Sequence, residues 1–251
     1  MKIADLNDTE ARQTMGGFEF SAAPLDELGA SEYTLVGIVC DVSGSVSSWK
    51  QDLEKTLGTV LKACKQHPRA ENLMLRTTTF NQDVDEIHGF VELVTMDDNA
   101  FHDALCCGGS TALREATLSG IEAVKAYGDA LRDKRYNVNA ALYIVTDGDD
   151  NASRGCPASQ IKALIEEIRQ QEKIESILTV LVGVGTNQRL LDLLNNFQQE
   201  AGIDAFIRMG DATPKNLAKL GQFISDSVSS QSKDLNSGQS TQVMQSSQLT
   251  I

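Results

Sequence analysis

The sequence predicts an α/β fold in which helices cover both faces of a mostly parallel, doubly wound, six-stranded sheet. Three observations lead to this prediction. Short apolar runs rich in β-branched residues alternate along the chain with segments whose apolar residues recur at helical spacing, which is typical of βαβ units. The runs are apolar at consecutive positions, as in strands that are buried on both faces. One pair of runs is joined by a turn too short for a crossover helix, so that pair must be antiparallel.

The strands are expected wherever such an apolar run lies between turn residues. The first run, residues 33–40, ends at a Gly/Ser turn, and the polar turn 81–83 separates the second run from the third. The third strand is therefore expected to be antiparallel and to lie at an edge of the sheet. In chain order, the six expected strands are residues 33–40, 73–80, 85–91, 140–145, 177–184 and 205–209.

Helices are expected between the strands because apolar residues there return every three or four positions, as Trp49, Leu53 and Leu57 do. Thr213 and Pro214 form a favourable cap and first-turn pair for the last helix. The expected helices are residues 46–65, a short one at 95–105, then 113–131, 161–168, 190–197 and 214–230. Together the elements predict a Rossmann-like arrangement with helices on both faces of the sheet.

The chain of 251 residues is expected to form one domain with two tails. Residues 1–32 show no sustained periodicity and are interpreted as an N-terminal arm, with a strand-like patch at residues 18–20. The domain itself is expected at residues 32–230. Residues 231–251 are rich in Ser and Gln and are interpreted as a flexible C-terminal tail.

Composition excludes several classes of partner. The formal net charge is −13, from 35 acidic against 22 basic residues, so a nucleic-acid backbone would be repelled. No apolar stretch approaches the ~20 residues that span a bilayer, so no membrane contact is expected. Five cysteines and a polar N-terminus without a signal peptide favour a reduced, cytoplasmic location. The adjacent pair Cys106 and Cys107 matches no tetrahedral zinc spacing, and we interpret it as semi-buried thiols, with a soft-metal or redox site as the alternative.

A candidate cation site begins where the first strand ends. The segment Asp41-Val42-Ser43-Gly44-Ser45 places one carboxylate and two hydroxyls on the loop that leaves this strand. Oxygen ligands of this kind favour Mg²⁺, Mn²⁺ or Ca²⁺ over zinc. Taken alone, the segment is better explained as ordinary turn chemistry, in which Asp41 caps the following helix.

Two later loops support the interpretation of this segment as part of a cation site. Thr111 follows Gly108-Gly109-Ser110 at the start of a helix, and Asp147 lies in Thr146-Asp147-Gly148 after the fourth strand. Ends of parallel strands meet at one edge of a sheet, where such loops can share a ligand. Three further residues near these loops, Asp149, Asp150 and Ser110, are candidates for contacts just outside the site, although Asp149 and Asp150 are equally well explained as turn residues.

The order Asp41-x-Ser43-x-Ser45, then Thr111, then Asp147 resembles the von Willebrand factor A (vWA) family and its metal-ion-dependent adhesion site (MIDAS). The resemblance covers residues 32–230 and points to an intracellular, stand-alone member. It implies that Asp41 and Asp147 act in or next to the coordination sphere. It also implies that Ser43 and Ser45 bind the ion directly, and that Thr111 does so when a partner is bound.

The expected function is a metal-dependent protein–protein interaction. A site with two carboxylates leaves the cation partly electropositive, so an Asp or Glu of a partner protein can complete its coordination. Such a module would be an adaptor or subunit of an intracellular assembly and would not be an enzyme. A structural protein whose tails bind partners is one alternative. A metal-dependent phosphohydrolase is another, but Ser43 occupies the position where those enzymes carry a second aspartate. The sequence does not predict the oligomeric state.

Overall fold

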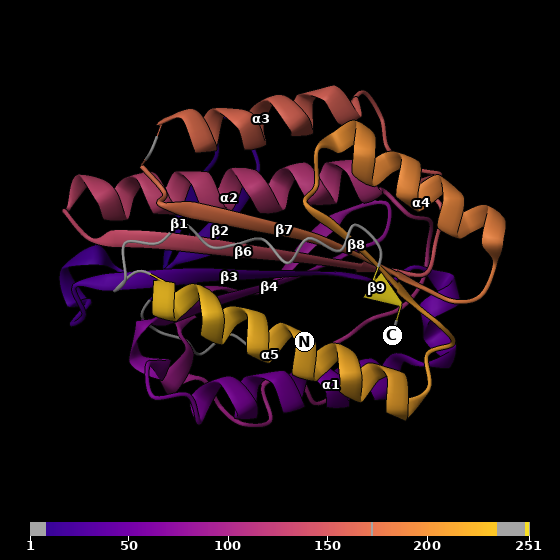
Figure 1. The fold of residues 1–251 in the computed structure, drawn as a ribbon, viewed down its shortest axis with the longest axis horizontal. Coiled ribbons are helices and arrows are strands. Elements are labelled where there is room, and N and C mark those ends of the chain that lie inside the picture. The colour runs from indigo at the N-terminus through magenta and orange to yellow at the C-terminus, as the bar shows by residue number, and fades with distance from the viewer. Residues whose placement is uncertain (1–8, 172, 235–248, 251) are drawn as a thin grey trace.

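The computed structural model describes residues 9–171, 173–234 and 249–250. A central sheet lies between two layers of helices (Figure 1). The strands, in chain order, are β1 (Glu10–Gln13), β2 (Glu19–Ala22), β3 (Glu32–Asp41), β4 (Leu73–Phe80), β5 (Val84–Glu92), β6 (Asn137–Thr146), β7 (Ser176–Val184), β8 (Ala205–Met209) and β9 (Leu249–Thr250). The α-helices are α1 (Lys50–Lys65), α2 (Leu113–Asp133), α3 (Ala158–Gln171), α4 (Gln188–Ala201) and α5 (Pro214–Asp234).

The sheet is wider than the sequence predicts. Its order is β1-β2-β5-β4-β3-β6-β7-β8-β9, and the six expected strands correspond to β3 through β8. The α/β class and the mostly parallel sheet are confirmed, because β4, β3, β6, β7 and β8 run parallel. The expected number of six strands is wrong: among the described residues, eight strands have four or more residues, and the two-residue β9 adds a ninth.

The antiparallel strand is not at the edge. β5 pairs antiparallel with β4, as expected, but β2 covers its other side and β1 pairs with β2. The carboxylate of Glu86 on β5 binds Ser21 of β2, accepting hydrogen bonds from its backbone N at 3.0 Å and its Oγ at 2.5 Å. Phe20 and Ala22 are buried beside β5. This part of the expected N-terminal arm is therefore built into the sheet.

Helices cover the sheet as the apolar runs require. Along β3, Leu35 and Val39 pack on the side of α2, α3 and α4, whereas Val36 and Ile38 pack on the side of α1 and α5. Figure 1 shows these two helix layers above and below the strands. Side chains on both faces of a central strand such as β3 therefore pack against helices. Because both faces are buried, apolar residues occupy consecutive positions along the strand.

The expected short helix at residues 95–105 is wrong. The segment begins with a 3-10 turn, Leu93–Thr95, and then forms separate turns, such as the one closed by Asn99 N on Asp97 Oδ1 at 2.7 Å. Asp103 has φ = 54°, which no α-helix accommodates. Met96, Phe101 and Leu105 are nevertheless buried, so apolar burial holds the segment without helical hydrogen bonds.

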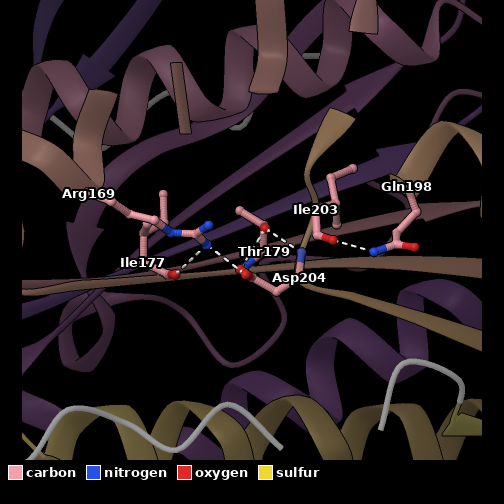
Figure 2. A network of polar contacts seen from close by, with 6 residues as sticks. All are labelled: Arg169, Ile177, Thr179, Gln198, Ile203 and Asp204. Atoms are coloured by element: carbon pink, nitrogen blue, oxygen red, sulfur yellow. Dashed lines mark hydrogen bonds and ion pairs between the residues drawn. The ribbon is translucent and has the colours of Figure 1, made fainter. Parts of the chain in front are cut away.

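A polar network joins four elements at the N-terminal end of β8 (Figure 2). The carboxylate of Asp204 accepts hydrogen bonds from Thr179 N and Oγ1, both at 2.8 Å, and from Arg169 Nη2 at 2.6 Å. Gln198 of α4 donates to the carbonyl of Ile203. This network fixes α3 and α4 against β7 and β8, at the sheet edge opposite to the carboxyl ends of the strands.

The C-terminal tail predicted at residues 231–251 lies mostly outside the described residues. α5 continues to Asp234, and β9 pairs parallel with β8 through Ile207 with Leu249 and Arg208 with Thr250. Within the described part of the chain, none of the helices has the length and apolarity needed to cross a membrane.

Candidate functional site

Asp41 lies at the centre of the candidate site. It is the last residue of β3, and its side chain is buried, with 1% of its surface exposed. Its Oδ1 accepts a hydrogen bond from Ser43 N at 2.7 Å, and its Oδ2 accepts one from Thr146 Oγ1 at 2.5 Å. Because β3 and β6 pair in parallel, with Cys40 opposite Val145, the loops after both strands begin at the same height.

A chain of hydroxyls connects this loop to Asp147. Ser43 Oγ lies 3.2 Å from Ser45 Oγ, and Ser45 Oγ donates to Asp147 Oδ1 at 2.5 Å. The other oxygen, Asp147 Oδ2, accepts a hydrogen bond from the indole of Trp49 at 2.9 Å. Four of the five predicted ligands are thus linked in one network, which holds both carboxylates in fixed orientations.

Thr111 enters from the third loop. Its side chain is buried, and its backbone N donates to Asn151 Oδ1 at 2.8 Å, while its carbonyl accepts from the backbone N of Asn151 and Ala152. A Cβ placed on Gly148 would lie 3.0 Å from Thr111 Oγ1 and 3.4 Å from Asp41 Oδ2. The absence of a side chain at residue 148 therefore lets these two groups approach the same space.

Backbone hydrogen bonds fasten the loops together. Gly108 N donates to Val42 O at 2.7 Å, and Gly44 N donates to Gly109 O at 3.2 Å. These two hydrogen bonds join the loop before α2 to the loop after β3. The structure brings all five predicted ligands to one place, although they are spread over more than a hundred residues of sequence.

The electrostatics favour an added cation. Burial raises the pKa of Asp41 above its ordinary value; hydrogen bonds from Thr146 and Ser43 lower the pKa in part, and the negative charge of Asp147 raises it. The ionised Asp41 is therefore held at a cost in the protein without a cation. A positive charge between the two carboxylates would favour the ionised form and offset that cost.

The donor set fits a hard divalent ion. Among residues 9–171, 173–234 and 249–250, no three His, Cys, Asp or Glu side chains group as a metal site, so any ion held here depends on hydroxyl oxygens. Two carboxylates and three hydroxyls offer only oxygen, which suits Mg²⁺, Mn²⁺ or Ca²⁺. The residues that would hold the ion are Asp41, Ser43, Ser45, Thr111 and Asp147.

Asp149, Asp150 and Ser110, which are expected just outside the site, differ from one another in their surroundings. The carboxylate of Asp150 faces Arg114 of α2, with 3.0 Å between Oδ2 and Nε. Asp149 is exposed. Ser110 borders a surface groove of about 540 Å³ beside Thr111, and its backbone N donates to Gln82 Oε1 at 3.3 Å. Further side chains lining this groove are those of Asp83, Glu115, Asn151, Ser153 and Arg154.

Sequence reasoning assigned no role in the site to Trp49 or Thr146, and it did not predict that Asn151 holds the backbone of Thr111. Trp49 and Thr146 each hydrogen-bond one of the carboxylates, and Asn151 holds the backbone of Thr111. Thr146 and Asn151 stand within a few positions of Asp147, so their place after β6 was a usable signal. Nothing in the sequence indicates that Trp49 contacts the site, because its spacing from Leu53 and Leu57 is that of an ordinary apolar residue on a helix.

No family model matches the sequence, and no curated protein matches it. Solved structures do share the fold. The PilB minor pilin from Streptococcus sanguinis is 12% identical, with a TM-score of 0.53 over 85% of this chain and 65% of that one. The pilus adhesin SpaC from Lactobacillus rhamnosus GG is 10% identical, with a TM-score of 0.51 over 92% and 35%. Proximal thread matrix protein 1 from the mussel byssus, with a zinc-occupied MIDAS motif, is 14% identical, with a TM-score of 0.50 over 80% and 47%.

These likenesses concern the fold. This chain spans less than two thirds of each of the three proteins. One neighbour has a metal-occupied MIDAS motif, which agrees with the vWA-like architecture that the sequence predicts.

Proposed function

We propose that this chain is a metal-dependent protein-interaction module. In this proposal Asp41, Ser43, Ser45, Thr111 and Asp147 hold a divalent ion, with Mg²⁺ as the first choice and Mn²⁺ or Ca²⁺ as alternatives. An Asp or Glu of a partner protein completes the coordination. The observation that carries the proposal is the hydrogen-bonded network that links Asp41, Ser43, Ser45 and Asp147, together with the position of Thr111 Oγ1 beside the same space next to Gly148.

The surroundings support a protein ligand. The groove of about 540 Å³ beside Thr111 is lined by polar and charged side chains of both signs, including Asp83, Glu115 and Arg154. A partner's acidic residue on the ion would place its neighbouring residues in or near this groove, where they add contact area and select the sequence. The module would then serve as an adaptor or subunit of an intracellular assembly, with no chemical step of its own.

Direct metal binding comes first among the tests. Trp49 is the only tryptophan of the chain, and its indole donates to Asp147, so its fluorescence should change as Mg²⁺ is titrated. Asp41→Ala should abolish the change. Ser47 is exposed on the 3-10 turn Gly44–Ser48, and Ser47→Ala should respond as the wild type does. An unchanged titration of Asp41→Ala would refute the assigned site.

Partner binding is tested by affinity capture with the wild type, Asp41→Ala and Ser47→Ala, each with Mg²⁺ and with chelator. The proposal expects a protein that is retained only by the wild type and Ser47→Ala with Mg²⁺. Equal recovery in all conditions would refute it. Unfolding with chelator tests the structural alternative: a metal that only mediates binding leaves a folded protein, and a structural metal leaves none.

A further inference from the structure

Two adjacent thiols lie on the loop that carries Thr111. Cys106 is exposed and Cys107 is half-buried, whereas Cys40, Cys64 and Cys156 are buried. All five cysteines are free. A small thiol reagent therefore meets the adjacent pair before any other cysteine of the protein.

The loop after the thiols is fastened to the backbone of the proposed metal site. Gly108 N, which follows Cys107 directly, donates to Val42 O, and Gly109 O accepts from Gly44 N. Val42 and Gly44 flank Ser43, one of the proposed ligands, and Thr111 follows Gly109 by two positions. Two hydrogen bonds therefore connect the backbone just after residues 106–107 directly to the loop of the proposed ligand Ser43.

The same loop is fixed on its other side. Leu105 is fully buried, and its backbone N donates to Glu54 Oε1 of α1 at 3.0 Å. Backbone movement at the cysteines cannot be absorbed there without breaking a buried hydrogen bond. It passes instead to Gly108 and Gly109, the two least restricted residues of the loop, of which Gly109 has φ = +83°.

We propose that Cys106 and Cys107 form a reversible disulfide that weakens cation binding by displacing the loop of residues 106–111. The effect on binding rests on the proposed function, whereas the movement of the loop does not. A two-electron thiol oxidant, such as a peroxide or a diazene, supplies the reaction. The thiolate of Cys106 attacks the oxidant, Cys107 then attacks Cys106 Sγ, and one S–S bond replaces two S–H bonds. Both protons and both electrons pass to the oxidant.

The order of attack follows from the surroundings. Burial raises the pKa of Cys107, which lowers its thiolate fraction and leaves the exposed Cys106 as the first nucleophile. Ring closure then strains the backbone. Adjacent Cα atoms are about 3.8 Å apart across a trans peptide, whereas disulfides span about 4.4–6.8 Å. The peptide must twist, and its strain makes the bond easy to reduce.

The test uses the full chain, reduced and then treated with the diazene diamide. Mass spectrometry should show the loss of two hydrogens within the peptide that contains residues 106–107. Amide hydrogen exchange at residues 41–45 and 108–111 should increase, and the Mg²⁺ concentration at half-change of Trp49 fluorescence should rise about 10- to 100-fold, as when a group that orients a ligand is lost. Dithiothreitol should restore both properties.

Cys106→Ser is the matched control, because it keeps Cys107 and cannot close the ring. Diamide should leave its hydrogen exchange and its Mg²⁺ titration unchanged. Absence of the bridge in the wild type, or a bridge that leaves the exchange of residues 41–45 unchanged, would overturn the proposal. If the reduced wild type binds no Mg²⁺ while closure still alters this exchange, the proposed function fails and the coupling of the thiols to the loop stands.

Discussion

Gly148→Ala is the substitution that examines the site most directly. The new methyl group would lie 3.0 Å from Thr111 Oγ1 and 3.4 Å from Asp41 Oδ2, and ordinary contact begins at 3.4 Å. The Thr111 oxygen must therefore move by about 0.4 Å, which is the difference between the 3.0 Å contact and the 3.4 Å at which ordinary contact begins. Metal–ligand distances tolerate only about 0.2 Å. The substitution should therefore remove Thr111 from a coordination sphere without removing any oxygen.

Thr111 cannot avoid this contact by a shift of its backbone. The backbone of Thr111 is held by Asn151 Oδ1 on its N and by the backbone N of Asn151 and Ala152 on its carbonyl. Extra volume in such a fixed place costs about 1–3 kcal/mol of folding free energy. Affinity for the cation should fall about 10- to 100-fold.

Thermal unfolding with and without Mg²⁺ measures the effect. At a Mg²⁺ concentration of about 100 times the wild-type Kd, the ion stabilises the wild type by about 2.7 kcal/mol. With affinity reduced 10- to 100-fold, the same concentration stabilises Gly148→Ala by about 0.4–1.4 kcal/mol. For a chain of this size, each kcal/mol shifts Tm by about 2–4 °C, so the two proteins are readily distinguished.

Gly58→Ala is the matched control. Gly58 lies within α1, and a Cβ there would meet nothing within 4 Å. Alanine should stabilise the helix by about 0.5–1 kcal/mol and leave the response to Mg²⁺ unchanged. A wild-type Mg²⁺ response in Gly148→Ala would refute the placement of Thr111 and Asp41 around one ion.

Three further outcomes are expected. Asp204→Asn should lower the free energy of unfolding by about 1–3 kcal/mol, because it weakens the network of Figure 2; Asp192→Asn on the exposed face of α4 should have little effect in the same denaturant titration. Burial lowers the pKa of His88 to about 4, so the unfolded chain binds the proton first, and stability should fall by about 3 kcal/mol as pH drops from about 6.5 to 4; His88→Gln should lack this component. Trp49→Phe should weaken Mg²⁺ binding, because Asp147 loses its indole donor, and calorimetry with wild-type affinity would contradict this.

Much of the fold follows from local signals in the sequence. The central strands are continuous apolar runs because helices cover both of their faces. Their parallel direction brings the loops after β3 and β6 to one edge, which is why the sequence alone is enough to pair Asp41 with Asp147. The Gly-rich loop that carries Thr111 precedes a helix, and this position predicts that it lies at the same edge of the sheet as Asp41 and Asp147.

Other parts depend on contacts between distant residues. β1 and β2 have four residues each, and they are held by Glu86 on Ser21 and by Glu122, whose carboxylate accepts from Thr14 Oγ1 at 2.5 Å. No local periodicity encodes such contacts. The segment at residues 95–105 shows the reverse case: the sequence predicts a short helix there, but the burial of Met96, Phe101 and Leu105 outweighs the local preference.

The site combines rigid and movable parts. Asp41 and Thr146 end the two central strands, where helices on both faces restrict any movement. Thr111, in contrast, lies on a loop whose position depends on a few hydrogen bonds to Val42, Gly44 and Asn151. Changes in the loop can therefore alter affinity for a cation while the sheet and its carboxylates stay in place. Control of binding should act through residues 106–111, whereas substitutions around Asp41 should change affinity and folding stability together.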